Sequence, residues 1–230
     1  MSVELDLLIK SKQLRDRNLS GQRLFGAELD QADLEGANLS DCRLSGAALN
    51  QANMVKANLS NAHLSRAQMT EANLTGADLT GAKMSEVNLT KANLSQAIAP
   101  HAKLSEANLS YANLEDCDLA AADLSNADLH GAILTGANLT DAILSNANLD
   151  GAILTSCQLS GVRLNQANCS NADLRAAQFS GADLSGASFQ GADLSYADLS
   201  QVNIYSANFS GATLCEALMP DGSRSKQGCV

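Results

Sequence analysis

The sequence is poor in aromatic residues and in positive charge. It has no Trp, 4 Phe and 3 Tyr among 230 residues, and its formal net charge is −10. A protein that binds nucleic acid directly needs a basic face with aromatic rings on which bases can stack. We therefore expect no direct nucleic-acid partner.

Long apolar runs are also missing. No stretch approaches the roughly 20 apolar residues that a membrane-spanning helix requires, and the amino end has none of the features of a signal peptide. We expect a cytoplasmic protein that does not associate with a membrane.

The chain is built instead from one short repeat. Residues 179–200 read FSGADLSGASFQGADLSYADLS, in which each unit is Ala, then Asp or Asn, then Leu, then two small polar residues. A large apolar residue occupies positions ending in 4 or 9, and Ala occupies positions ending in 2 or 7. This register starts near Leu14, is regular from Ala27 and runs to Met219 without insertion or deletion, which makes about forty units.

The spacing of the repeat predicts an all-β solenoid. Two inward side chains separated by one outward side chain are typical of an extended strand. The next two residues must also face outward, so the chain turns a corner in every unit. Ser, Thr, Gly, Asn and Asp at these corners suit tight turns. An α-helix is a poor alternative, because a five-residue apolar period drifts around a 3.6-residue turn.

Residues that depart from the repeat indicate how many sides each coil has. Basic residues recur every twenty positions just before the apolar position, at Arg23, Arg43, His63, Lys83 and Lys103. Ile133 and Ile153 are also twenty apart, as are Phe189 and Phe209. Four units per coil therefore predict a square coil, and stacking at about 4.8 Å gives about ten coils in a rod roughly 50 Å long.

These units resemble the pentapeptide-repeat proteins, whose signature is Ala, Asp or Asn, Leu and two variable residues. The resemblance covers roughly nine-tenths of the chain. It implies a right-handed quadrilateral β-helix. The ending Met219-Pro220-Asp221-Gly222 is similar to that of cyanobacterial members, some of which act in regulation or development.

Three segments follow from the extent of the repeat. Residues 1–16 are predicted to be a capping segment with a short helix, N-capped by Ser2, because an open solenoid end must be covered. An amphipathic docking helix is the alternative for this segment. Residues 17–219 form the β-helix, and residues 220–230 form a flexible polar tail. We expect a monomer, with an end-to-end dimer through the exposed last coil as the alternative.

The cysteines favour a reducing compartment. Cys42, Cys117 and Cys157 occupy the inward alanine position and Cys169 an inward leucine position, so they read as buried thiols. Cys117 and Cys157 share a column two coils apart, too far for a disulfide. The two remaining cysteines, at positions 215 and 229, are candidate reactive thiols.

No catalytic or metal-binding constellation is recognisable. His63, His101 and His130 fall on three different columns, so they cannot form a cluster of metal ligands. The many carboxylates lie on open faces and lack a cleft that would tune one as an acid or base. We expect a protein that is not an enzyme and that needs neither a cofactor nor a metal.

The candidate partner-binding face is the column of basic residues, to which the corner residue Arg66 adds charge. Its residues are Arg23, Arg43, His63, Arg66, Lys83 and Lys103. A tolerated surface pattern is the alternative interpretation. Two other departures are the segment Ile98–His101, read as an irregular corner or a recognition notch, and the outward pair Ile133 and Ile153, too small a patch to demand a partner.

The sequence favours a protein-interaction scaffold or regulator that binds a partner with an acidic surface through an outer face. The alternative is a DNA mimic that occupies a topoisomerase such as gyrase, as some acidic members of the resembled family do. The net charge favours mimicry, whereas the basic column interrupts any continuous acidic face.

Overall fold

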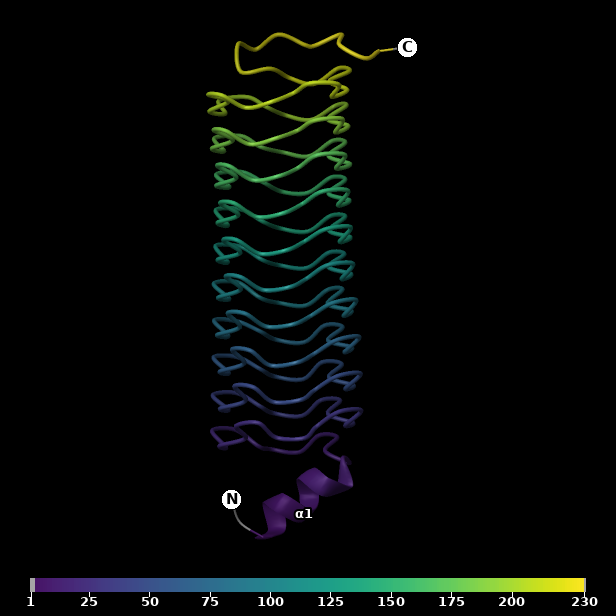
Figure 1. The fold of residues 1–230 in the computed structure, drawn as a ribbon, viewed down its shortest axis with the longest axis vertical. Coiled ribbons are helices and arrows are strands. Elements are labelled where there is room, and N and C mark those ends of the chain that lie inside the picture. Colours follow the sequence, from purple (N-terminus) through teal and green to yellow (C-terminus); the bar gives the residue numbers. More distant parts are fainter. Residues whose placement is uncertain (1–2, 230) are drawn as a thin grey trace.

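The computed structural model describes residues 3–229, as one helix followed by a stack of four-sided coils. Helix α1 spans Val3–Ser11 and lies at one end of a straight rod, and the carboxyl end of the chain lies at the other (Figure 1). The remaining described residues form isolated β-bridges joined by turns rather than long strands.

The bridges between coils join residues twenty positions apart, all in parallel. Starting from Gln13, one residue in every five forms such a bridge, so a coil of twenty residues has four sides. The same register continues to the bridge between Asp198 and Leu218. The chain is therefore a solenoid with coils of twenty residues. This is the length predicted from the residues that depart from the repeat.

Backbone hydrogen bonds occupy four of the five amides in the units of the inner coils, which have a neighbouring coil on both sides. In one unit, Arg43 N donates to Gln22 O of the preceding coil at 2.9 Å, and Leu44 N donates to His63 O of the next coil at 2.7 Å. The second corner residue bonds the next coil as well, and the alanine position closes the turn. The amide of the first corner residue has no backbone acceptor in these patterns.

The outward Asn or Asp supplies the acceptor for this fifth amide. Its side-chain Oδ1 accepts the amide of the residue two positions later, as between Asn38 and Ser40 at 3.1 Å and between Asp78 and Thr80 at 2.9 Å. Such local turns are a recognised property of Asn and Asp side chains. The repeat thus prefers Asn or Asp before Leu because this residue completes the hydrogen bonding of the corner.

The corner conformation explains the choice of its second residue. Gly36 has a φ of 65° and Asp41 a φ of 57°, and the equivalent residue of the other corners also has a positive φ. A type II β-turn requires a positive φ at its third residue, where Gly or Asn is favoured. Gly, Asn and Asp recur at this position for that reason.

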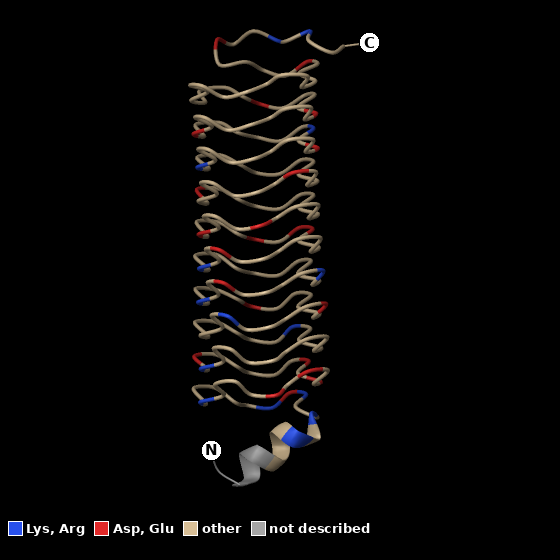
Figure 2. Cartoon of the chain, viewed as in Figure 1, with Lys and Arg blue, Asp and Glu red and all other residues tan. Residues whose placement is uncertain are grey.

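The core is a continuous column of inward Leu and Ala side chains, nearly all of them inaccessible to solvent. Phe189 stacks on Phe209 with ring centroids 5.1 Å apart, which fills the section near the carboxyl end. No charged side chain is buried among residues 7–229, and charged residues are distributed over the outside of the rod (Figure 2).

Helix α1 contacts the first coil through two apolar residues. Ile9 is buried and Leu8 packs partly against the core, whereas Leu7 is exposed. The predicted N-cap, Ser2, lies outside the described residues.

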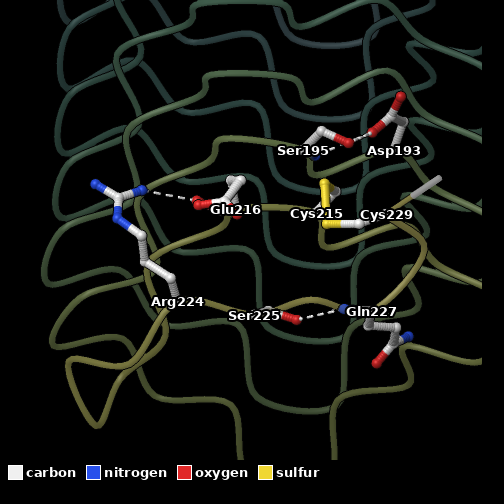
Figure 3. The surroundings of a disulfide bond; sticks show 8 residues. All are labelled: Asp193, Ser195, Cys215, Glu216, Arg224, Ser225, Gln227 and Cys229. Carbon is white, nitrogen blue, oxygen red and sulfur yellow. Dashed lines mark hydrogen bonds between the residues drawn. A yellow bond between two sulfur atoms is a disulfide. The ribbon is translucent and has the colours of Figure 1, made fainter.

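The carboxyl-terminal segment corrects two predictions. Residues 220–229 are not a free tail: they fold back along the last coil, with an antiparallel bridge between Leu218 and Arg224. Glu216 N donates to Ser225 O at 2.8 Å. Cys215 and Cys229, the candidate reactive thiols of the sequence, form a disulfide (Figure 3). The returning segment forms hydrogen bonds with backbone groups of the last coil that would otherwise be unpaired. This segment lies outside the repeat, so the repeat pattern does not predict its fold.

Replacing Leu124 by Asp is expected to lower the melting temperature by about 10 °C or more. Leu124 is fully buried, and an unpaired carboxylate there costs several kcal/mol. Thermal unfolding followed by circular dichroism measures the shift. The control is Asp123→Ala at the neighbouring outward position, which should change the melting temperature far less. Equal melting temperatures for Leu124→Asp and the wild type would contradict the buried core.

Replacing Cys229 by Ser is expected to release the returning segment and leave the rod folded. The disulfide closes a loop with a sequence separation of 14, and such a cross-link contributes about 3 kcal/mol. Hydrogen exchange should accelerate in residues 214–229 and stay unchanged in the middle coils. Reducing agent should reproduce this in the wild type and add nothing to Cys229→Ser. Slow exchange in the reduced wild type would show that the disulfide does not hold the segment.

Candidate protein-binding face

The predicted basic residues do lie in one column on successive coils. Bridges join Arg23 to Arg43, Arg43 to His63, His63 to Lys83 and Lys83 to Lys103, and the column continues through Asp123. All five side chains point outward because they alternate with buried residues. We call these five residues the basic column; that they bind a partner stays a prediction.

One contact inside the basic column sets the role of its histidine. Lys83 Nζ lies 3.2 Å from His63 Nε2. A lysine ammonium can only donate, so in this arrangement His63 Nε2 is the acceptor. The positive charge of the column is therefore carried by its arginines and lysines.

The corner residue Arg66 does not add free charge to the face. Its Nη2 lies 2.9 Å from Glu86 Oε1 and its Nε lies 3.0 Å from Glu86 Oε2, twenty residues along the chain. Hydrogen bonding within this pair raises the pKa of Arg66 and lowers the pKa of Glu86. Glu86, which the sequence places beside Lys83, is thus occupied by Arg66.

The cations of the basic column have no such partner. Within residues 3–229, no ion pair involves Arg23, Arg43, Lys83 or Lys103. They lie on an open face, and the backbones of Arg23 and Arg43, and those of Lys83 and Lys103, are roughly 5 Å apart on adjacent coils, with His63 between the two pairs. Neighbouring like charges at this spacing repel by about 1 kcal/mol in water before screening. The arrangement favours an acidic occupant that would relieve this repulsion.

The side chains of the basic column also cannot accept the hydrogen bond from the corner amide. Arg, His and Lys have no Oδ1, and in the described chain no side chain accepts the amides of the corner residues that follow them, Phe25, Ser45, Ser65, Ser85 and Ser105. In the adjoining column, Asn18, Asn38, Asn58 and Asp78 keep the bond in four successive coils. The fifth residue of that column is Ile98, and the corner residue after it, Pro100, has no amide hydrogen to donate. A local rule broken in five successive coils on one face is expected where function has replaced local stability.

An exposed aromatic residue beside the column was missed in the sequence. Phe25 occupies a first corner position, where the repeat has a small polar residue, and its side chain is 57% exposed. The adjoining corners, Gly26 and Gly46, have open space where a side chain would stand. Aromatic and Arg side chains are the residue types that dominate binding energy at interfaces. A phenylalanine in a Ser/Thr position was the signal that could have found it.

The predicted irregularity at Ile98–His101 is absent. Ala102 N closes the turn on Ala99 O at 3.2 Å, and His101 has the usual positive φ of 59°. Pro100 takes the first corner position, where its fixed φ fits and no amide is needed. The chain therefore passes this point without a notch.

The described residues contain no cluster of side chains that could hold a metal ion. No group of three or more His, Cys, Asp or Glu side chains in this part of the chain is placed to hold a metal ion. Burial raises the pKa of Cys117, Cys157 and Cys169 to about 12, so these thiols stay protonated and are poor nucleophiles at neutral pH. None of the helices in the described region is long and apolar enough to span a bilayer.

The fold and this surface define a four-sided parallel β-solenoid that presents its outer faces. The chain belongs to the pentapeptide-repeat family: the family described as pentapeptide repeats matches successive segments between residues 14 and 219. No curated protein sequence matches the chain significantly.

Solved structures that are similar to the chain include HetL and QnrB1. HetL, a pentapeptide-repeat protein involved in heterocyst differentiation regulation in the cyanobacterium Nostoc sp. strain PCC 7120, is 33% identical, with a TM-score of 0.66; the match covers 98% of this chain and 100% of HetL. A trypsin-treated variant of QnrB1, a plasmid-mediated fluoroquinolone resistance protein, is 21% identical, with a TM-score of 0.56 over 70% of this chain and 86% of QnrB1. The second similarity shows the fold alone.

Proposed function

We propose that this protein is a non-enzymatic scaffold or regulator that binds an acidic surface of another protein through the basic column and Phe25. The observation that carries the proposal is the column itself: four cations without an ion pair follow one face, and the same positions have lost the corner hydrogen bond. The similarity to HetL over nearly the whole chain supports a regulatory role.

DNA mimicry is the weaker candidate. A mimic needs a continuous acidic face, whereas the column that contains Asp123 and Asp183 also contains Lys103, Ile143 and Arg163. The similarity to QnrB1 is too low in sequence identity to carry a function across.

The same proposal includes the finer features of the rod. We propose a right-handed β-helix of about ten coils, with α1 as the cap that covers its first coil. We also propose a cytoplasmic monomer. In a reducing cytoplasm the Cys215–Cys229 disulfide is expected to be open.

Reversing two charges of the basic column tests the proposal. Arg23→Glu/Arg43→Glu should weaken binding of the physiological partner about tenfold or more, because attraction to its acidic surface becomes repulsion. The double variant should stay folded, since Glu28 occupies the equivalent outward position on the next face. Quantitative affinity capture from the source cells, followed by titration of the recovered partner, measures the loss.

The matched control is Lys56→Glu/Lys91→Glu, which makes the same change in net charge at corners outside the column. It should recover the same partner as the wild type. Recovery of identical partners by the wild type and by Arg23→Glu/Arg43→Glu would overturn the proposal.

A further inference from the structure

An exposed apolar patch lies on the face opposite the basic column. Ile133 and Ile153 are bridged to each other in a column half a coil away from Arg23 and Arg43, and each is 38% exposed. Tyr111, at the corner beside this column, is 55% exposed. We call Tyr111, Ile133 and Ile153 the isoleucine patch; the tyrosine makes it larger than the sequence indicates.

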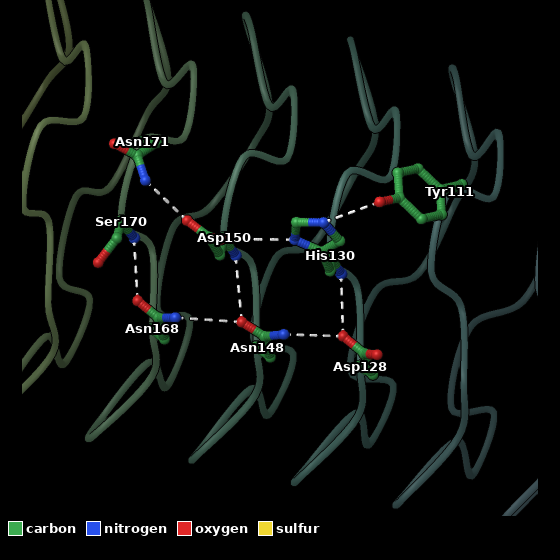
Figure 4. Close-up of polar contacts among 8 residues, drawn as sticks. All are labelled: Tyr111, Asp128, His130, Asn148, Asp150, Asn168, Ser170 and Asn171. Atoms are coloured by element: carbon green, nitrogen blue, oxygen red, sulfur yellow. Dashed lines mark hydrogen bonds and ion pairs between the residues drawn. The ribbon is translucent and has the colours of Figure 1, made fainter.

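Contacts to the coils that follow hold Tyr111 in place. Its ring packs over Gly131, where a Cβ would collide with it, and meets the His130 ring edge-on with centroids 5.2 Å apart. Tyr111 Oη lies 3.0 Å from His130 Nε2, and His130 Nδ1 lies 3.5 Å from Asp150 Oδ2 (Figure 4). Asp150 in turn accepts from Asn171 at 2.9 Å. An aromatic side chain fixed before binding loses little entropy when a partner covers it.

Several of the corners beside the two isoleucines are glycines, which have no side chain. Gly131 and Gly136 form the corners on either side of Ile133, and Gly151 forms one beside Ile153 with open space above it. Tyr111 lies over Gly131 and Asp116 over Gly136, so a partner segment on Ile133 would also meet these two side chains, whereas the side of Ile153 at Gly151 is open.

Ile133 and Ile153 are both expected to lower the stability of the repeat. Neither side chain can accept the amide of the corner residue that follows, Thr135 or Thr155, whereas Asn138 accepts that of Thr140 at 3.1 Å on the next face. Each isoleucine also exposes apolar area to water. An Asn at either position would avoid both costs, so the isoleucines are expected to serve a partner.

The charge around the patch defines the chemistry of that partner. From Leu104 to Val162 the chain has no Lys or Arg, and its acidic residues there are Glu106, Glu115, Asp116, Asp118, Asp123, Asp128, Asp141 and Asp150. Figure 2 shows the middle of the rod with acidic positions and no basic ones. Asp116 lies over Gly136, next to Ile133, and Glu115 is exposed beside it. An apolar surface with an acidic border fits a segment with apolar side chains between cations.

We propose that the isoleucine patch docks a cationic amphipathic segment of a second protein. Its apolar side chains would cover Ile133, Ile153 and Tyr111, and its Lys or Arg side chains would face Glu115 and Asp116. Because the basic column lies on the opposite face, the rod presents two partner surfaces of opposite charge and can hold two proteins at once.

A charge-neutral double variant tests this inference. The probe is a fluorescein-labelled amphipathic peptide of Leu and Lys, and binding is measured by fluorescence anisotropy. Ile133→Asn/Ile153→Asn should weaken binding about tenfold or more, although the charge of the rod is unchanged. Its melting temperature should equal or exceed that of the wild type, because each Asn restores the acceptor for a corner amide.

Ile143→Asn is the matched control, since it makes the same substitution on the face of the basic column. It should bind the probe as the wild type does, and binding of a Leu/Glu peptide at the basic column should be the same in all three proteins. The proposal is overturned if the wild type does not bind the Leu/Lys probe, if the double variant binds it equally well, or if Ile143→Asn loses binding to the same extent. Sedimentation that shows self-association of the wild type, abolished in the double variant, would assign the patch to a second copy instead.

Discussion

The whole structure depends on hydrogen bonding between coils that are twenty residues long. Each unit donates three amides to the adjacent coils and one to its own turn, so shifting a coil by one residue would move every inward leucine to the outside. The fifth amide falls to the outward side chain, which is why Asn or Asp precedes Leu in most units. Stability is therefore shared along the stack, as expected of a solenoid in which each coil contacts only its neighbours.

The residues that determine the fold are therefore different from those that are available for binding. The inward positions and the corners determine the fold, and the outward position tolerates Arg, Lys or Ile at the cost of one hydrogen bond that water can replace. The basic column and the isoleucine patch are two of the places where that cost recurs in successive coils on one face. Their opposite charge and opposite placement are consistent with a rod that holds partners on two sides.

Much of the fold could be predicted from the sequence because the pattern is local and repeats. The alternation of Ala and Leu predicts the core, and the twenty-residue spacing from Arg23 to Lys103 predicts the column in which these residues lie. The role of the outward Asn and Asp side chains could not be predicted. A preference for these residue types does not indicate which backbone amide their side-chain oxygen accepts. The Arg66–Glu86 pair could not be predicted although its spacing is also twenty, because Lys83 lies nearer to Glu86 in the sequence. The returning segment after Pro220 is not periodic, and nothing in its composition signals that Cys229 meets Cys215.

The distance between spin labels on one column tests the stacked square coil most directly. Asn88 and Asn168 face outward on one column, and the buried thiols with raised pKa should not react with the label. In Asn88→Cys/Asn168→Cys, coils of twenty residues predict a nitroxide separation of roughly 19 Å by pulsed electron paramagnetic resonance. A separation of roughly 26 Å, as three-sided coils of fifteen residues would give, or a broad distribution of distances would contradict the account.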